Sequence, residues 1–173
     1  INSLNVTGPF NLQIKQVTSS LRVAIDDISW TGNNSNPPCQ EPITQPTALT
    51  FSSTPTSITG NFVAASSTPN AYLVVRSTSS TLLVDPADGS SYSAGQSLGG
   101  GTVVVTTSGT TFTDINLSPS TIYYYFVFSL NDQDCNGGAN YLQTTPLTGN
   151  TATQNIPACI APFNPPTGLV LTP

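Results

Sequence analysis

Apolar residues along the chain come in short runs of β-branched and aromatic side chains, separated by polar turn residues. Runs such as AYLVVR and TVVVTT recur about every 8 to 15 residues, without the period of an amphipathic helix. Prolines (15) and glycines (13) lie between the runs, as in a β-sandwich with short connections. After Pro46 the pattern predicts about seven strands, at residues 47–53, 57–65, 71–79, 102–108, 110–116, 121–130 and 147–154. The predicted fold class is all-β.

The first 45 residues do not belong to that series of strands. Residues 1–31 contain two apolar runs that predict a β-hairpin. Two strands bury too little apolar surface to be stable alone, so we expect this hairpin to pack on a missing part of a larger sandwich, on the module, or on another chain. Residues 32–45 have no periodicity, are rich in proline and asparagine, and predict a linker.

A short pattern occurs twice in the chain. Cys39 in CQEPITQPTALTF and Cys159 in CIAPFNPPTGLVL are both followed by Pro at the third position, Pro-Thr at the seventh and eighth, and Leu at the tenth. The copies align without a gap, offset by 120 residues from position 39 to position 159. Residues 46–155 are therefore predicted to form one module, and residues 156–173 a linker and the first strand of the next repeat.

The stretch LSPSTIYYYFVFSL, residues 117–130, holds three consecutive tyrosines. Its first residues match the L-x-P-x-T-x-Y pattern that leads into a central strand of fibronectin type III domains. The chain resembles that family over about residues 46–155, and the resemblance implies that Tyr123 forms the tyrosine corner, with Leu117 and Pro119 shaping the turn before it. Strand alternation makes both faces of this strand apolar, as in a central strand covered on at least one side, and leaves Tyr124 as the tyrosine with a chance of exposure.

Three further features extend or qualify the resemblance. Where the family usually has a core tryptophan on its second strand, this chain has Phe62, which supplies less aromatic volume. The long loop 85–101 resembles that of modules in multidomain secreted bacterial proteins, and VAIDDISWTG resembles the last strand of the jelly-roll domains that precede such modules. The resemblance thus implies a secreted bacterial protein, with the end of a jelly-roll-like domain in residues 1–31.

The composition excludes several classes of partner. Charged residues are 6% of the chain, against about 25% in an average soluble domain, and 47 of the 173 residues are serine or threonine. The net charge is −5, and three residues in all are lysine or arginine. These cations are too few for a nucleic-acid backbone or an anionic membrane surface. No apolar run approaches the roughly 20 residues of a membrane-spanning helix. We therefore expect neither nucleic-acid binding nor membrane insertion.

Side chains for catalysis or metal binding are few. The chain has no histidine, so Ser-His-Asp and Cys-His arrangements are impossible. Asp26 and Asp27 are adjacent on a predicted strand and point to opposite faces. Asp132 and Asp134, in the loop after residues 121–130, are weak calcium candidates, because calcium takes six or more oxygen ligands and a solvated loop is the simpler interpretation. We expect no enzymatic activity and no cofactor.

Three cysteines without histidine indicate an oxidising, extracellular location. Loops of an antiparallel sandwich alternate between its two ends, so Cys39, before the first strand, and Cys135, after the sixth, should lie at the same end. Cys159 follows one more strand, and a strand spans about 17–20 Å, too far for a disulfide. We therefore predict that Cys39 pairs with Cys135, and that Cys159 is the next repeat's copy of Cys39.

The interpretation with most support is a non-catalytic extracellular module, a spacer or adhesive stalk, whose partners are neighbouring modules and a possible surface glycan or protein. One alternative is a carbohydrate-binding module attached to a secreted hydrolase, which requires exposed coplanar aromatic rings. The rings that could contribute are Trp30, Tyr72, Tyr92, Tyr124 and Tyr141. Another alternative is a subunit of a self-assembling filament or surface layer, with residues 1–31 packed on a neighbouring chain.

Overall fold

The computed structural model describes residues 36–159 and residue 168, and in this part of the chain it contains nine β-strands and no helix. The hairpin and jelly-roll predictions for residues 1–31, with Trp30, Asp26 and Asp27, lie outside the described residues. The strands are β1 (Thr47–Ser53), β2 (Ser57–Val63), β3 (Ala71–Ser77), β4 (Ser97–Leu98), β5 (Gly101–Thr107), β6 (Thr111–Ile115), β7 (Ile122–Asn131), β8 (Asn140–Tyr141) and β9 (Leu147–Ala152).

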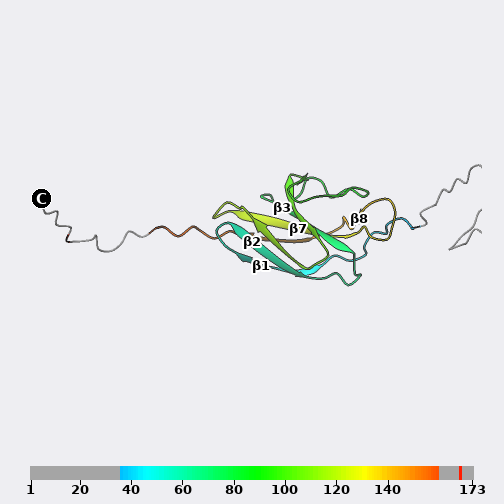
Figure 1. Cartoon of the computed structure of the whole chain (residues 1–173), viewed down its shortest axis with the longest axis horizontal. Helices are drawn as coiled ribbons and strands as arrows, with labels where there is room; N and C mark the ends of the chain where they lie inside the picture. Colours follow the sequence, from blue (N-terminus) through cyan, green and yellow to red (C-terminus); the bar gives the residue numbers. More distant parts are fainter. Residues whose placement is uncertain (1–35, 160–167, 169–173) are drawn as a thin grey trace, which may run out of the picture. The chain divides into compact units, whose positions relative to one another are not determined.

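The strands form two antiparallel sheets that face each other. One sheet has the order β1-β2-β6; the other has the order β4-β5-β3-β7-β8, and β9 also pairs with β7. Figure 1 shows β1 and β2 in one layer and β3 and β7 in the other. All pairings between named strands are antiparallel. The prediction of an all-β sandwich is confirmed.

The core between the sheets is built by alternate residues of their facing sides. Its buried members are Ile58, Phe62, Ala65, Tyr72, Val74, Phe112, Leu117, Tyr123, Tyr125 and Val127. Strand alternation explains the set, because Tyr123, Tyr125 and Val127 are two residues apart on β7 and share its inner face. These side chains hold the two sheets together by removing apolar surface from water.

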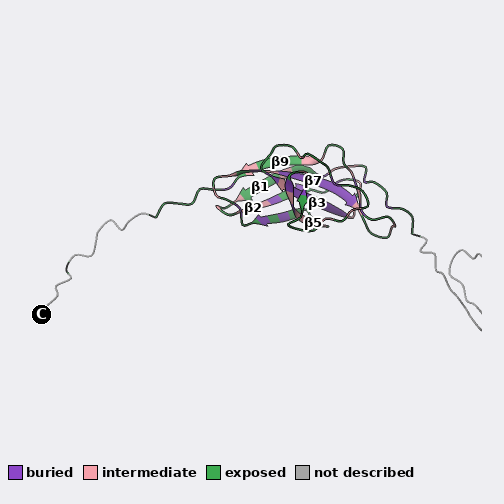
Figure 2. Cartoon of the chain, turned by 90° about the horizontal axis from the view of Figure 1, so that it is seen from above, coloured by how far each residue is buried: buried purple, intermediate pink, exposed green. Residues whose placement is uncertain are grey.

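A second core covers the opposite, outer face of the larger sheet. Its members are Ala71, Leu73, Val75, Leu98, Val103, Phe126, Phe128, Leu130, Ala139 and Tyr141, with Leu82, Tyr92 and Tyr124 packed against them. The side chains that cover the sheet come from the long segment between β3 and β5 and from the region around β8. Strand β7 is therefore buried on both faces, which explains why its sequence is apolar without alternation (Figure 2).

The two shortest strands were not predicted from the sequence. β4 lies in the segment expected to be an irregular loop, and β8 lies between the two last predicted strands. Both segments are tied together by hydrogen bonds: Gly89 N donates to Ala139 O at 2.7 Å, and Tyr141 N donates to Asp88 Oδ1 at 2.8 Å. The long loop is thus a cover for the second core, and two residues of its DPADG segment (85–89), a sequence typical of a β-turn, make that attachment.

Candidate functional site

The end of the sandwich beyond the last residue of β7 carries the disulfide expected from the sequence. Cys39 is bonded to Cys135, 96 positions later, with their Cα atoms 4.8 Å apart. Cys39 is buried, whereas Cys159 is a free, exposed cysteine. The predicted pairing is confirmed, because the six long strands β1, β2, β3, β5, β6 and β7 return the chain to the end at which it started.

Residues 36–46, which we name the N-terminal strap, lie against this same end. Pro38 forms a parallel bridge with Asn136, and Cys39 N donates to Asn136 O at 3.0 Å. Gln45 supplies a second attachment, because its side chain accepts a hydrogen bond from Ser129 N at 2.9 Å and donates to Leu142 O at 2.7 Å. The part of the predicted linker that the structure describes is therefore fastened along the module.

The tyrosine expected at the corner before β7 is in place. Tyr123 is buried, and its hydroxyl accepts a hydrogen bond from Ser118 N at 3.1 Å. Leu117 is also buried, and its backbone N donates to Thr56 O at 3.0 Å. Pro119 O accepts a hydrogen bond from the Thr121 hydroxyl at 3.0 Å, so the turn is closed on both sides of the tyrosine.

Replacing Tyr123 with phenylalanine is expected to lower the free energy of unfolding by about 0.5–1.5 kcal/mol. The substitution keeps the ring in the core and removes the acceptor of the Ser118 amide. Chemical denaturation monitored by circular dichroism measures the change. A loss near zero would mean that water replaces the hydroxyl at no cost.

Phe62, the aromatic residue expected in the core from the sequence, lies between the two sheets. Its side chain is buried and meets the Tyr72 ring edge-on, with the ring centroids 4.9 Å apart. The Tyr72 hydroxyl accepts a hydrogen bond from Ala65 N at 2.9 Å, which keeps its ring in position. Phe62 and Tyr72 therefore form an edge-on aromatic pair within the core between the sheets.

An ion pair at the edge of the inner core was not anticipated. Arg76 on β3 donates to Asp114 on β6 at 2.9 Å, and their side chains are 23% and 8% exposed. The hydroxyl of Tyr125 donates to the other oxygen of Asp114 at 3.0 Å. Arg76 also lies over the Tyr123 ring, 5.5 Å from its centroid. Because Arg76 is the sole lysine or arginine in residues 36–159, this cluster holds the positive charge of the described module.

Alkaline conditions are expected to destabilise the fold through Tyr125 and Tyr141. Burial is the main cause that raises the pKa of both phenols, to about 12 for Tyr141, and Asp114 adds to the rise for Tyr125. Above pH 10 the folded state therefore keeps protons that the unfolded chain loses. The free energy of unfolding should fall from about pH 10 upward by up to about 1.4 kcal/mol per pH unit for each tyrosine. Denaturant titrations between about pH 8 and 11.5 measure how the free energy of unfolding falls with pH. The Tyr125→Phe variant should show a smaller fall per pH unit.

Asp132 and Asp134, the calcium candidates, lie in the loop between β7 and Cys135 with both residues exposed. The Asn70 side chain shapes this loop by accepting hydrogen bonds from Asp132 N at 3.3 Å and Gln133 N at 3.2 Å. Within the part of the chain that the structure describes, no three histidine, cysteine, aspartate or glutamate residues are grouped to hold a metal ion. The arrangement gives a calcium ion two carboxylates at most.

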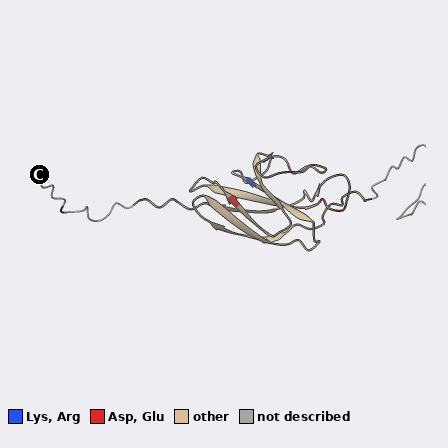
Figure 3. Ribbon diagram, in the orientation of Figure 1, with Lys and Arg blue, Asp and Glu red and all other residues tan. Residues whose placement is uncertain are grey.

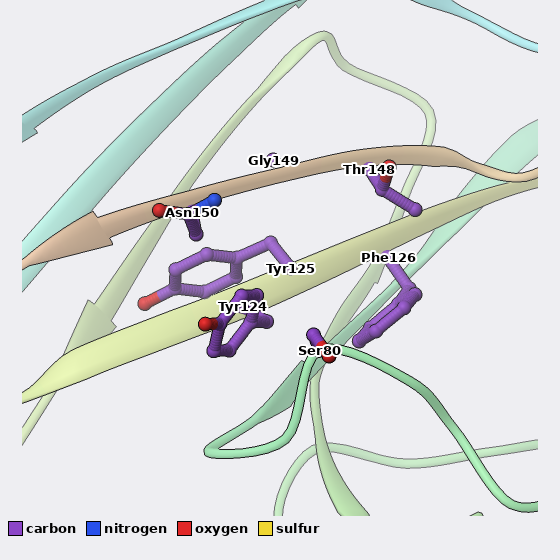
Figure 4. Close-up of a pocket in the computed structure, with 7 residues that line it drawn as sticks. All are labelled: Ser80, Tyr124, Tyr125, Phe126, Thr148, Gly149 and Asn150. Atoms are coloured by element: carbon purple, nitrogen blue, oxygen red, sulfur yellow. The ribbon is translucent and has the colours of Figure 1, made fainter.

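The tyrosines considered for carbohydrate binding do not form a common platform. Tyr72 and Tyr141 are buried, and Tyr92 packs edge-on against Tyr141 with the ring centroids 5.8 Å apart. Tyr124 is partly exposed and borders a shallow groove of about 270 Å³ on the larger sheet. Figure 4 shows Tyr124 and Ser80 on the same side of β7. The groove offers one partly exposed aromatic ring among uncharged polar groups.

Charge is sparse over the described ribbon, which Figure 3 shows almost entirely without acidic or basic residues. The acidic residues in residues 36–159 are Glu41, Asp85, Asp88, Asp114, Asp132 and Asp134. Among the described residues there is no helix long and apolar enough to cross a membrane.

Several solved structures are similar to this chain. A fibronectin type III domain of human collagen XX is 23% identical, with 67% of this chain and 97% of that chain covered and a TM-score of 0.41. The FN5 domain of Drosophila Lar is 14% identical, with 64% and 96% covered and a TM-score of 0.39. The structure of FN3tt is 13% identical, with 67% and 96% covered and a TM-score of 0.43.

No protein-family model matches the chain. No curated protein matches it either. The strand order of the two sheets and the tyrosine corner at Tyr123 are nevertheless both present in the molecule itself. The described module has a fibronectin type III-like β-sandwich fold.

Proposed function

We propose that this chain is a non-catalytic structural module, a spacer or adhesive stalk, in a tandem-repeat protein that is secreted or displayed on a bacterial cell surface. The observation that carries the proposal is the position of the two connections. The strap is fixed beyond the C-terminal end of β7 by the disulfide. Residues 153–159 leave the sandwich at the N-terminal end of β7, because Ala152 pairs with Ile122, the first residue of that strand (Figure 1). Connections at opposite ends suit modules joined in series.

The internal repeat supports neighbouring modules of the same polypeptide as the partners. The register of β1 shifts between Thr47 and Thr50, and Ala48 has a φ of 56° there. The aligned position of the second copy is Gly168. Glycine adopts a positive φ without the steric cost that a Cβ imposes. The sequence of the second copy is therefore compatible with a first strand that has the same irregularity as β1 at Ala48.

The chemistry of the module supports an extracellular location. Disulfides form and persist outside the reducing cytosol, and the described module has one that joins residues far apart in the sequence. A surface built from serine and threonine with few charges depends little on salt or pH. Both properties suit an exposed stalk.

The alternatives have less support. A carbohydrate-binding module stacks sugars on exposed rings, and two of the candidate tyrosines are buried. The filament hypothesis depends on residues 1–31, which lie outside the described residues.

Two measurements on the full chain test the proposal. Size-exclusion chromatography with light scattering should give a monomer at every concentration, and a glycan array should give no signal. Association that increases with concentration would favour the filament subunit. Reproducible binding to one glycan class, abolished by Tyr124→Ala, would favour the carbohydrate-binding module.

A further inference from the structure

We propose that the disulfide sets the path of tension through the module, so that residues 40–134 cannot be drawn out and β9 is pulled lengthwise along β7. The proposal rests on the proposed function in one respect, because a stalk of serial modules is pulled at its two connections. It follows from three features of the described chain: the position of the disulfide, the pairing of β7 with β9, and the hydrogen bonds at the exit.

The first step is the transfer of tension at the strap. A pull on the chain before Cys39 reaches the disulfide before it reaches β1, which begins at Thr47. The covalent bond passes it to Cys135, a few residues beyond Asn131 at the end of β7. Residues 40–134 form a closed loop between the two cysteines. They cannot be drawn out while the bond is intact.

The second step is the direction in which β9 is loaded. β7 is pulled from its C-terminal end, through Cys135, and β9 is pulled from its own C-terminal end, through Thr153. The strands are antiparallel, with Tyr123 opposite Thr151 and Val127 opposite Leu147, so their C-terminal ends lie at opposite ends of the pair. The force therefore shears β9 along β7, and the hydrogen bonds between these two strands are loaded at the same time instead of opening one after another.

The third step is the anchor where the chain leaves the sandwich. Thr153 is buried; its hydroxyl donates to Ser118 O and accepts from Thr121 N at 3.0 Å. Gln154 N donates to Thr54 O at 3.0 Å, and Gln154 O accepts from Ser120 N at 3.2 Å. These bonds join the exit to the tyrosine-corner turn and to the turn between β1 and β2. Tension reaches β9 only after this anchor has opened.

The path differs when the disulfide is reduced. Tension then continues through the strap into β1, an edge strand paired with β2 alone and irregular around Ala48. Residues 39–153 can then extend to about 390 Å at roughly 3.4 Å per residue, whereas residues 135–153 extend to about 60 Å. After subtraction of a folded span of about 30 Å, the length of the ten-residue strand β7, the oxidised module gains about 3 nm and the reduced module about 36 nm.

Single-molecule stretching of the full chain, held by handles at both ends, tests the proposal. Cys159→Ser removes the free thiol in every sample. The module without reductant should lengthen by about 3 nm when it unfolds, and the same molecule in dithiothreitol should lengthen about 12 times as much. Equal increments in the two conditions would overturn the proposal. The oxidised increment is informative by itself, because a value above about 30 nm would show that the enclosed residues are drawn out.

Two variants that each remove one hydroxyl separate the two paths. Thr153→Val takes away the two hydroxyl hydrogen bonds of the exit anchor, and Thr50→Val takes away the hydrogen bond from Thr50 Oγ1 to Asn61 O, between β1 and β2. The force that unfolds the oxidised module should fall for Thr153→Val and stay unchanged for Thr50→Val. If Thr50→Val lowers that force as much, tension runs through β1 and the proposal is wrong. These results hold for the isolated chain whatever its biological role, so they are independent of the oligomer and glycan tests.

Discussion

The double variant Cys39→Ala with Cys135→Ala is expected to have a free energy of unfolding about 4–5 kcal/mol lower than that of the oxidised protein. The two cysteines are 96 positions apart, and a cross-link between distant residues removes the most conformational freedom from the unfolded chain. Alanine is the appropriate replacement at Cys39, which is 6% exposed, because serine would bury a hydroxyl there. Denaturant titrations followed by tyrosine fluorescence measure the difference.

A matched control is available in the third cysteine. Cys159 is exposed and unpaired, so Cys159→Ser should change the free energy of unfolding by less than about 0.5 kcal/mol. Reduction of the parent protein should reproduce the effect of the double variant. A loss below about 1 kcal/mol in both experiments would mean that the strap's hydrogen bonds hold it without the disulfide, or that the unfolded chain is already compact.

The disulfide could be predicted from the sequence because its position follows from the number of strands. Each strand reverses the chain, so the parity of strands between two cysteines decides whether they lie at the same end. The short strand β4 was missed, yet it did not spoil the result, because it is two residues long and belongs to a segment that returns to where it began. The other missed strand, β8, lies beyond Cys135 and does not enter the count. Tyr123 could be predicted for a similar reason, since the turn that positions it is encoded within the few residues before it.

The second core could not be predicted, because nothing in the local pattern says what will cover the outer face of β7. Phe126 and Phe128 indicated an apolar face, but Tyr92 and Tyr141, which help to cover it, come from segments without strand periodicity. The attachment of those segments depends on single contacts between distant residues, such as Asp88 with Tyr141. Such contacts leave no periodic signal in the sequence.

The ion pair was missed for a different reason. Asp114 and Arg76 lie 38 positions apart on strands of different sheets, and neither has a neighbour in sequence that indicates a partner. In a chain with 6% charged residues, a signal was nevertheless present. Both residues interrupt strands that are otherwise apolar or polar without charge, and a charged residue on a buried strand is rarely left unpaired.

Asp114→Ala is accordingly expected to lower the free energy of unfolding by about 2–3 kcal/mol. The carboxylate accepts from Arg76 and from the hydroxyl of Tyr125, a residue with no exposed surface. Its removal leaves the tyrosine hydroxyl as a buried donor without its acceptor and the guanidinium without its counter-ion. Because the Arg76 side chain is 23% exposed, water solvates part of that charge, so the loss should be smaller than the roughly 3–5 kcal/mol that follows when a fully buried pair is broken.

A double-mutant cycle separates the tyrosine from the ion pair. Once Asp114 is alanine, Tyr125→Phe removes the orphaned hydroxyl and should restore part of the stability, with a coupling of about 1–2 kcal/mol between the two positions. Asp132→Ala is the matched control, because its side chain is exposed and its loss should change stability by less than about 0.5 kcal/mol. Equal losses for Asp114→Ala with and without the tyrosine hydroxyl would show that Asp114 stabilises the module through Arg76 alone. A loss below about 0.5 kcal/mol for Asp114→Ala would show that water replaces the carboxylate as the partner of Arg76 and Tyr125. The cluster would then contribute no more to stability than a solvent-exposed salt bridge.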